Sequence, residues 1–339
     1  MAKKSLFRRV ALLVVVLIGV AGIAAVAILK GSCVSEPVEL FIPSGTPYST
    51  VLDSLESAGV KKMGLIKMVG QYKELEKNIK PGHYVIGKGA NAMGIVALLK
   101  SGAQRPVKLV INNTRTLEQL ASKLAGQIEA DSASLYAHLT APATAKKYGL
   151  TTEELIGIFV ANTYEVWWTT TPEALTDRMN REWNNFWNES RTAMLQRTGL
   201  DKIDVVTLAS IVYEETKNKG EMPKIAGVYM NRLRRGIPLQ ACPTAKYAVG
   251  DFSLRRILNK HIQFESPYNT YLNQGLPPGP ICIPSIAAID AVLNYTEHNY
   301  IFFCAKEDFS GTHNFATTNA EHSANARRYQ EALNKRGIK

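Results

Sequence analysis

An uninterrupted apolar run at residues 10–29 constrains this chain more than any other feature. The run of about 20 residues contains no charged or strongly polar side chain, and a helix of that length spans the roughly 30 Å hydrocarbon core of a bilayer. Several cations precede the run and only Lys30 follows it closely, so the positive-inside rule places the N-terminus in the cytoplasm and residues 31–339 beyond the membrane. Residues 1–30 are therefore predicted to form a cytoplasmic tail and a single transmembrane helix.

A cleaved signal peptide is the alternative interpretation of this segment. Ala25, Val26 and Ala27 offer a cleavage site of small residues. The apolar run is longer than the ~7–15 residues usual for the apolar region of a signal peptide. An uncleaved anchor that contacts membrane lipid through residues 10–29 is therefore favoured.

The rest of the chain has an ordinary globular composition. Its 339 residues are 46% hydrophobic, which suits about two domains with their own cores. Much of the net charge of +11 comes from residues 1–30, and elsewhere lysine and arginine are interspersed with acidic residues. A nucleic-acid-binding face normally shows a concentrated basic stripe, so nucleic acid is not an expected partner.

No pattern in the sequence favours a cofactor or a metal. Residues 87–92 fit the loose G-x-G-x-x-A dinucleotide pattern, but the acidic residue expected about 20 positions later is missing. The six histidines lack the helical spacing of metal ligands, and the four cysteines contain no C-x-x-C pair. We therefore expect neither a cofactor site nor a metal site.

Strand and helix patterns after the anchor predict a small α+β module at residues 37–105. Residues 38–42 and 82–86 are expected to be strands, and residues 92–100 a helix that Gly102 ends. The opening strand-turn-helix pattern returns 69 positions later, with a strand expected at residues 107–111. A linking region at 106–150 is therefore expected to contain a further strand and helices.

Aromatic residues gather where the chain changes character at residue 151. All four tryptophans of the chain lie in this stretch. Aromatic side chains can form a platform for sugar rings, but the i,i+4 spacing of Trp183 and Trp187 is more typical of a helix packed on a core. We expect a separate domain of mixed α+β structure at residues 151–330.

A helix near residue 210 carries the most informative carboxyl group. Asp204 can cap its N-terminus, and Glu215 shares one arc of the helical wheel with apolar side chains. Burial on that face would raise the pKa of Glu215 and keep it protonated near neutral pH as a general acid, whereas Glu214 would stay ionised in water. The alternative is a structural carboxylate that pairs with Arg232 or Arg234 of the next helix.

Polar and aromatic loops follow that next helix, which is expected to start near Pro223 and to stop at Gly236. Segments rich in Pro, Asn and Tyr between helices usually rim or support a groove, although each alone can be turn chemistry. The candidate substrate-binding residues in these loops are Gln240, Tyr268, Asn269, Tyr271, His313 and Phe315.

Several of these segments occur in the same order in a known family. They are Leu208-Ala209-Ser210-Ile211-Val212-Tyr213-Glu214-Glu215-Thr216, Val228-Tyr229-Met230-Asn231-Arg232-Leu233, Leu239-Gln240, Pro243-Thr244, Tyr268-Asn269-Thr270-Tyr271 and Gly275-Leu276-Pro277-Pro278-Gly279. With these motifs the chain resembles the YceG-like family of endolytic murein transglycosylases. The likeness is close in residues 151–330, and residues 37–105 look like the LysM-like domain of that family.

The resemblance implies a function in peptidoglycan metabolism. It implies cleavage of the β-1,4 bond between N-acetylmuramic acid and N-acetylglucosamine in nascent glycan strands, with a 1,6-anhydro end left on the muramoyl residue. It also implies glycan strands as substrate, cell-wall synthases as partners and Glu215 as the catalytic residue. A single carboxyl group suffices for such chemistry, because the 6-hydroxyl of the muramoyl residue attacks its own C1.

Two departures from the family pattern and two other functions stay open at this point. Cys242 stands where the family commonly has Asp, and Ala161-Asn162 stands where Pro-Asp is common, which puts a role for the loop acid in doubt. A non-catalytic peptidoglycan-binding scaffold is one alternative. The other is a muramidase hydrolase, which needs a second carboxylate, with Glu265 or Asp290 as the available candidates.

Overall fold

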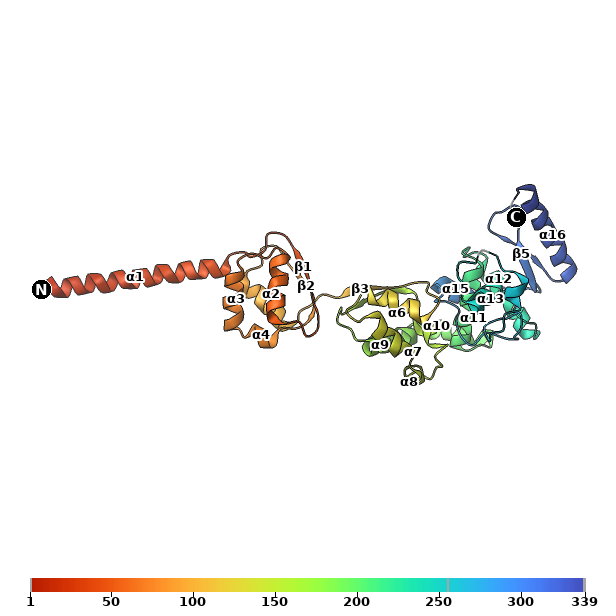
Figure 1. Ribbon diagram of the computed structural model, residues 1–339, viewed down its shortest axis with the longest axis horizontal. Helices are drawn as coiled ribbons and strands as arrows, with labels where there is room; N and C mark the ends of the chain where they lie inside the picture. Colours follow the sequence, from red (N-terminus) through yellow and green to blue (C-terminus); the bar gives the residue numbers. More distant parts are fainter. Residues whose placement is uncertain (1, 255, 338–339) are drawn as a thin grey trace. The chain divides into compact units, whose positions relative to one another are not determined.

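The computed structural model describes residues 2–254 and 256–337 and contains two compact units (Figure 1). The first unit contains the chain up to residue 108 together with residues 127–129 and 165–170. The second unit contains the remainder. Met1 and Arg255, which belong to the predicted tail and the predicted catalytic domain, lie outside the described residues.

The predicted membrane segment is part of one long helix, α1 (Ala2–Lys30). Within the described part of the chain, Leu12–Lys30 is the one helical segment long and apolar enough to cross a membrane, with a mean hydropathy of 3.1. The large apolar side chains described between Leu12 and Ile28 are exposed, as expected for a surface that faces lipid. This helix is compatible with a single-pass anchor.

The rest of the first unit is a two-stranded sheet covered by short helices. Its strands β1 (Val38–Ile42) and β2 (Gly82–Ile86) pair antiparallel, with Leu40 opposite Tyr84. Alternate residues of β1 face a core because strand side chains alternate between the two faces. The helices are α2 (Tyr48–Ser57), α3 (Met63–Tyr72), α4 (Leu75–Asn78) and α5 (Ala92–Ser101).

The N-terminal part of the second unit is mostly helical. Strand β3 (Val107–Ile111) pairs with β4 (Asn162–Val166), and residues 109–111 and 162–164 of these strands belong to this unit. The helices are α6 (Leu117–Ala125), α7 (Ser132–Thr140), α8 (Pro142–Lys147), the 3-10 helix η1 (Leu155–Ile158), α9 (Pro172–Phe186) and α10 (Glu189–Thr198). Trp183 and Trp187 are buried, with ring centroids 5.4 Å apart, so these two tryptophans belong to the core as predicted.

The C-terminal part of the second unit is built around helix α11 (Lys202–Glu215), which packs against α12, α13, α15 and η1. The hairpin β5–β6 is antiparallel, and the last helix packs on it. The remaining elements are α12 (Met222–Arg234), α13 (Cys242–Val249), α14 (Asn259–Ile262), α15 (Ile286–Leu293), β5 (Phe302–Ala305), β6 (His313–Ala316) and α16 (Asn319–Lys335).

Helix α11 differs from the sequence prediction in two respects. Its N-cap is Asp201 rather than Asp204, because Asp201 Oδ1 accepts a 2.8 Å hydrogen bond from the backbone N–H of Asp204. The helix is also buried on all sides from Val205 to Val212, since neighbouring elements cover every face. Glu215 is therefore the last residue of a central helix, in a final segment, residues 213–215, that is only partly buried.

These observations confirm a mixed α+β architecture with one apolar N-terminal helix. The three strands predicted at 38–42, 82–86 and 107–111 occur with those bounds. The predicted helix after residue 91 is confirmed too, with Asn91 as its N-cap and Gly102 in the left-handed conformation at its end. The LysM-like character of residues 37–105 stays a prediction.

Candidate active site

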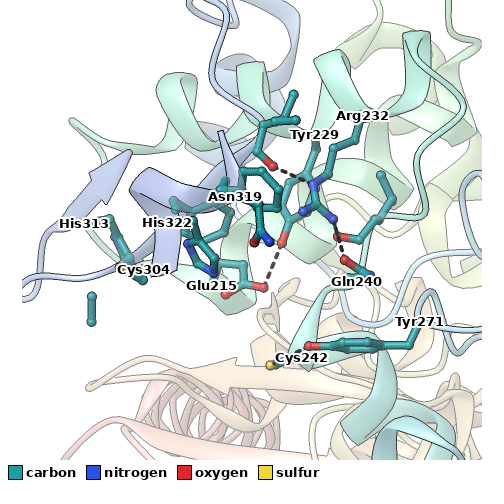
Figure 2. A pocket seen from close by; sticks show the side chains of 15 residues that line it. Glu215, Tyr229, Arg232, Gln240, Cys242, Tyr271, Cys304, His313, Asn319 and His322 are labelled. Carbon is teal, nitrogen blue, oxygen red and sulfur yellow. Dashed lines mark hydrogen bonds between the residues drawn. The ribbon is translucent and has the colours of Figure 1, made fainter. Parts of the chain in front are cut away.

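Glu215 lies in the wall of a cavity of about 510 Å³ in the second unit (Figure 2). This volume falls in the range of small-molecule and sugar sites in proteins. Its walls come from the ends of α11 and α12, the loop before α13, the hairpin β5–β6 and the start of α16. The lining residues are Glu215, Tyr229, Arg232, Leu239, Gln240, Cys242, Tyr271, Ile301, Phe302, Phe303, Cys304, Ala305, His313, Asn319 and His322.

The carboxyl group of Glu215 has one hydrogen-bond donor from the next helix. Tyr229 Oη donates to Glu215 Oε1 at 2.8 Å, and Figure 2 shows this bond at the centre of the cavity. The pKa of Glu215 is raised to about 7. Burial is the largest cause and the charge of Glu214 also raises this pKa, whereas the hydrogen bond from Tyr229 lowers it. A carboxyl group with this pKa can both give and take a proton near neutral pH.

The neighbouring carboxylate, Glu214, was predicted to be ionised in water. The structure instead places it in a largely buried ion pair. Its side chain is only 15% exposed and forms an ion pair with Arg115, whose guanidinium nitrogen lies 2.6 Å from Glu214 Oε2. Burial raises the pKa of Glu214, but the hydrogen bonds and charges of Arg115 and Lys217 together outweigh burial and bring this pKa below its usual value. Adjacent carboxyl groups on α11 thus have opposite pKa shifts. The sequence predicted different environments for the two groups, but not the ion pair that lowers the pKa of Glu214.

Arg232 is not the partner of Glu215. Its guanidinium donates instead to the carbonyl oxygens of Ile301, Pro238 and Leu239 at 2.7–3.0 Å, and to Oε1 of Gln240 at 3.1 Å. Gln240 has a left-handed backbone with φ of 51°. Arg232 therefore joins two segments, residues 238–240 and Ile301, and orients a side chain that lines the cavity.

Two polar pairs, Cys242 with Tyr271 and His313 with Glu221, contribute to other parts of the cavity wall. Cys242 Sγ and Tyr271 Oη lie 3.2 Å apart, and burial raises the pKa of both groups, so both stay neutral near pH 7. His313 from β6 is held by Glu221, whose carboxylate accepts from the His313 backbone N–H and lies 3.0 Å from Nδ1. Cys242 and Tyr271 therefore present neutral donors and acceptors in the wall that Glu215 shares.

Comparison with known proteins places this site in a family. Residues 40–328 match the model of the YceG-like family. The chain belongs to the YceG-like family.

Curated relatives of this family member carry one activity name. The endolytic murein transglycosylase of Bacillus subtilis strain 168 is 27% identical over 335 residues, covering 91% of this chain and 92% of that protein. The endolytic murein transglycosylase of Streptococcus pneumoniae strain D39 is 29% identical over 323 residues, covering 85% of this chain. The chain spans 57% of the length of that pneumococcal protein.

A solved structure supports the fold assignment. The crystal structure of a YceG-like protein from Listeria monocytogenes aligns with a TM-score of 0.57 and 26% sequence identity. The alignment covers 85% of this chain and 98% of the Listeria chain. The resemblance seen in the sequence motifs is thereby confirmed at the level of the family.

In this YceG-like chain, half of the predicted substrate-binding residues line the cavity with Glu215. These are Gln240, Tyr271 and His313. Asn269 is fully buried outside this cavity, and its amide donates to the carbonyls of Ile262 and Phe264, so it holds the loop together, and its role in substrate binding stays a prediction.

The other two predicted residues also lie outside the lining of this cavity. Tyr268 packs on Tyr247, with ring centroids 4.6 Å apart. Phe315 packs in an aromatic cluster with Tyr300 and Phe303. Both rings are partly exposed and contact aromatic neighbours, and a role for either in substrate binding stays a prediction.

Sequence reasoning missed several residues of the cavity wall. Asn319 and His322 come from α16, and His322 stacks on Phe302 of β5 with centroids 5.0 Å apart. These residues lie more than 100 positions after Glu215, and no local pattern links them to it. Among the described residues, no group of three potential ligand side chains is placed to hold a metal ion.

Proposed function

We propose that this chain is a membrane-anchored endolytic lytic transglycosylase of peptidoglycan, with Glu215 as its general acid and base. The reaction cleaves the β-1,4 bond between N-acetylmuramic acid and N-acetylglucosamine and leaves a 1,6-anhydro-muramoyl end. The observation that carries the proposal is a carboxyl group with a pKa of about 7 in a cavity whose lining residues include no second carboxylate. The activity named for the curated relatives supports it.

The mechanism follows from that single carboxyl group. Protonated Glu215 donates its proton to the glycosidic oxygen as the bond from C1 of the muramoyl residue to that oxygen breaks. The 6-hydroxyl of the same residue then forms the new bond to C1, and the Glu215 carboxylate accepts the hydroxyl proton. The proton count is restored after each turnover, and no water is consumed. The 6-hydroxyl is already part of the substrate, so its attack needs only orientation.

A hydrolase is disfavoured by where the other acids lie. A retaining or inverting glycosidase places two carboxyl groups across the scissile bond. Asp290 pairs with Arg191 at 2.9 Å and lines a different cavity, and Glu265 lines neither cavity that Glu215 does. Glu214 is engaged by Arg115. Asp290 and Glu214 are thus engaged by arginines, and Glu265 lies outside both cavities, which leaves no unpaired second carboxylate among the described residues that line them.

Location and partners belong to the same proposal. Residues 10–29 would anchor the protein in lipid of the cytoplasmic membrane, with the N-terminus in the cytoplasm and the catalytic domain outside. Nascent glycan strands and their synthases would then lie on the same side as the cavity. Protease added to intact cells from which the cell wall has been removed should digest residues 31–339. Protection of those residues would contradict this orientation.

The test uses the purified full chain in detergent with polymeric glycan strands. The wild-type protein should release fragments with 1,6-anhydro ends, detected by mass spectrometry. Glu215→Gln should fold normally and release none, whereas the matched variant Glu118→Gln, at an exposed position on α6, should retain activity.

The products also separate the alternatives. Reducing ends in place of anhydro ends would establish a muramidase hydrolase. Unchanged strands with tight binding would favour a scaffold in which the LysM-like module at 37–105 binds sugar. Full activity of Glu215→Gln would remove Glu215 from the proposed mechanism.

A further inference from the structure

A second, smaller cavity adjoins the first at Glu215. It measures about 220 Å³, and both Glu215 and Cys242 line it as well as the larger cavity. A polymer strand that presents its scissile bond to Glu215 therefore has a separate space available on each side of this carboxyl group. The remaining lining residues are Arg115, Glu214, Pro243, Lys246, Tyr247, Phe252, Leu254, Ile257 and Ile281.

The two cavities differ in the cations that they offer to a ligand. In the larger cavity, the Arg232 guanidinium is already bonded to three backbone carbonyls and Gln240. In the smaller cavity, the Arg115 side chain is 31% exposed, and its ion pair with Glu214 uses one of its nitrogens. Lys246 donates to the Leu254 carbonyl at 2.7 Å, which leaves further ammonium hydrogens for a ligand.

The one anion in the smaller cavity is offset by cations on both sides. Glu214 pairs with Arg115 at 2.6 Å and with Lys217 at 3.5 Å. Arg115 and Lys246 therefore leave a net positive wall while Glu215 holds its proton. Phe252 lies under the Arg115 guanidinium, 5.1 Å from its ring centroid, and supplies an apolar face beside the charge.

We propose that this smaller cavity, through Arg115 and Lys246, receives the acidic 3-O-lactyl arm of the muramoyl residue. The inference rests on the proposed function and adds how the enzyme would recognise its substrate. The lactyl ether is the group by which N-acetylmuramic acid differs from N-acetylglucosamine, and it carries a carboxylate itself or through its attached peptide. A cationic and aromatic pocket next to the general acid suits such a sugar acid.

The experiment measures binding by the full chain in detergent that carries Glu215→Gln, so that strands stay intact. Three probes are compared: glycan strands with stem peptides, strands stripped of peptides so that the lactyl carboxylates are free, and N-acetylglucosamine oligomers of matched length. Arg115→Gln and Lys246→Gln are each added to this background. Arg197→Gln, at an exposed position on α10 that lines neither cavity, is the matched control.

Loss of one charge-assisted contact should raise the Kd for muramoyl strands roughly tenfold and reduce its salt dependence. The Kd for N-acetylglucosamine oligomers should not change. Lys246→Gln keeps a donor for the Leu254 carbonyl, so it tests the inference even if Arg115→Gln fails to fold because Glu214 loses its partner. A loss confined to stripped strands would identify the lactyl carboxylate as the ligand, and a loss confined to peptide-bearing strands would identify the peptide carboxylates.

Other results would overturn the inference. Unchanged Kd values for both muramoyl probes in Lys246→Gln would do so, as would equal weakening of the N-acetylglucosamine oligomers. If wild-type protein still released anhydro ends, only this inference would fail. Absence of anhydro ends from the wild-type digest would instead remove the proposed function.

Discussion

Tyr229 Oη donates a 2.8 Å hydrogen bond to Glu215 Oε1, and this bond opposes the effect of burial on the same carboxyl group. Burial favours the neutral form of Glu215, whereas a donated hydrogen bond favours the charged form. Burial also raises the pKa of Tyr229 well above its usual value, so the phenol keeps its proton and remains a donor. The pair thus balances the two protonation states that a general acid and base must alternate between.

Tyr229→Phe should move the alkaline limb of the pH–activity profile upward. Removing the hydrogen bond takes away a stabilisation of the carboxylate, so the pKa of Glu215 rises further above about 7. A bond worth about 1 kcal/mol corresponds to a shift of roughly 0.7 pH units. The measurement is the rate of anhydro-end release between pH 5 and pH 9, taken at intervals of about 0.5 pH units.

The matched control for that variant is Tyr164→Phe, whose hydroxyl bonds the Val160 carbonyl outside the cavity. It removes the same atom and should leave the profile in place. A limb that stays fixed or moves to lower pH in Tyr229→Phe would show that the bond does not control Glu215.

The raised pKa of Glu215 also predicts how stability depends on pH. The unfolded carboxyl titrates near 4.5 and the folded one near 7, so between these values unfolding releases a proton. The free energy of unfolding therefore falls as pH rises from about 4.5 to 7, by roughly 3 kcal/mol over the whole window. Glu215→Gln should be more stable than the wild type at pH 8 and should lose this advantage at pH 4. Urea denaturation at both pH values measures this difference, and an equal difference at both would contradict it.

Local sequence patterns predicted the strands and helices better than they predicted the tertiary contacts of individual side chains. The strands at 38–42 and 82–86 were predictable because alternation of apolar side chains is a property of adjacent residues. The position of Glu215 on an apolar face was predictable for the same reason. The environment of the two adjacent carboxyl groups was not predictable. Arg115, the ion-pair partner of Glu214, lies 99 residues before Glu214, and no periodicity links residues so far apart.

The loop residues show a different limit. Asn269 and Gln240 belong to similar polar segments, and nothing in residue type separates them. The structure does, since Asn269 donates to two backbone carbonyls of its own loop whereas Gln240 faces the cavity. A buried Asn that satisfies loop carbonyls and a Gln that lines a cavity have the same sequence signature.

The N-cap correction on α11 has a measurable consequence. Asp201→Ala removes the side-chain acceptor for the Asp204 N–H and should lower the free energy of unfolding by about 1 kcal/mol. Asp204→Ala leaves that backbone bond intact and removes a carboxyl group whose pKa burial has raised, so it should cost less. Parallel urea denaturation curves at pH 7 compare the two. A larger loss for Asp204→Ala would return the cap to Asp204.

Arg232→Lys should affect stability and substrate affinity together. A lysine ammonium cannot span the Ile301 carbonyl on one side and the Pro238 and Leu239 carbonyls on the other, as the planar guanidinium does. Leaving buried carbonyls without donors should lower the free energy of unfolding by about 2–3 kcal/mol. Gln240 also loses the donor that orients it, so KM for glycan strands should rise while kcat changes less.

The matched control for Arg232→Lys is Arg234→Lys, because the Arg234 guanidinium donates to the Tyr295 hydroxyl and lines neither cavity at Glu215. This control should leave KM unchanged. If Arg232→Lys kept both its stability and its KM, the guanidinium would not be what holds the loop at 238–240 against β5. If instead only the stability fell, Gln240 would be positioned by its own left-handed backbone, and substrate affinity would be independent of Arg232.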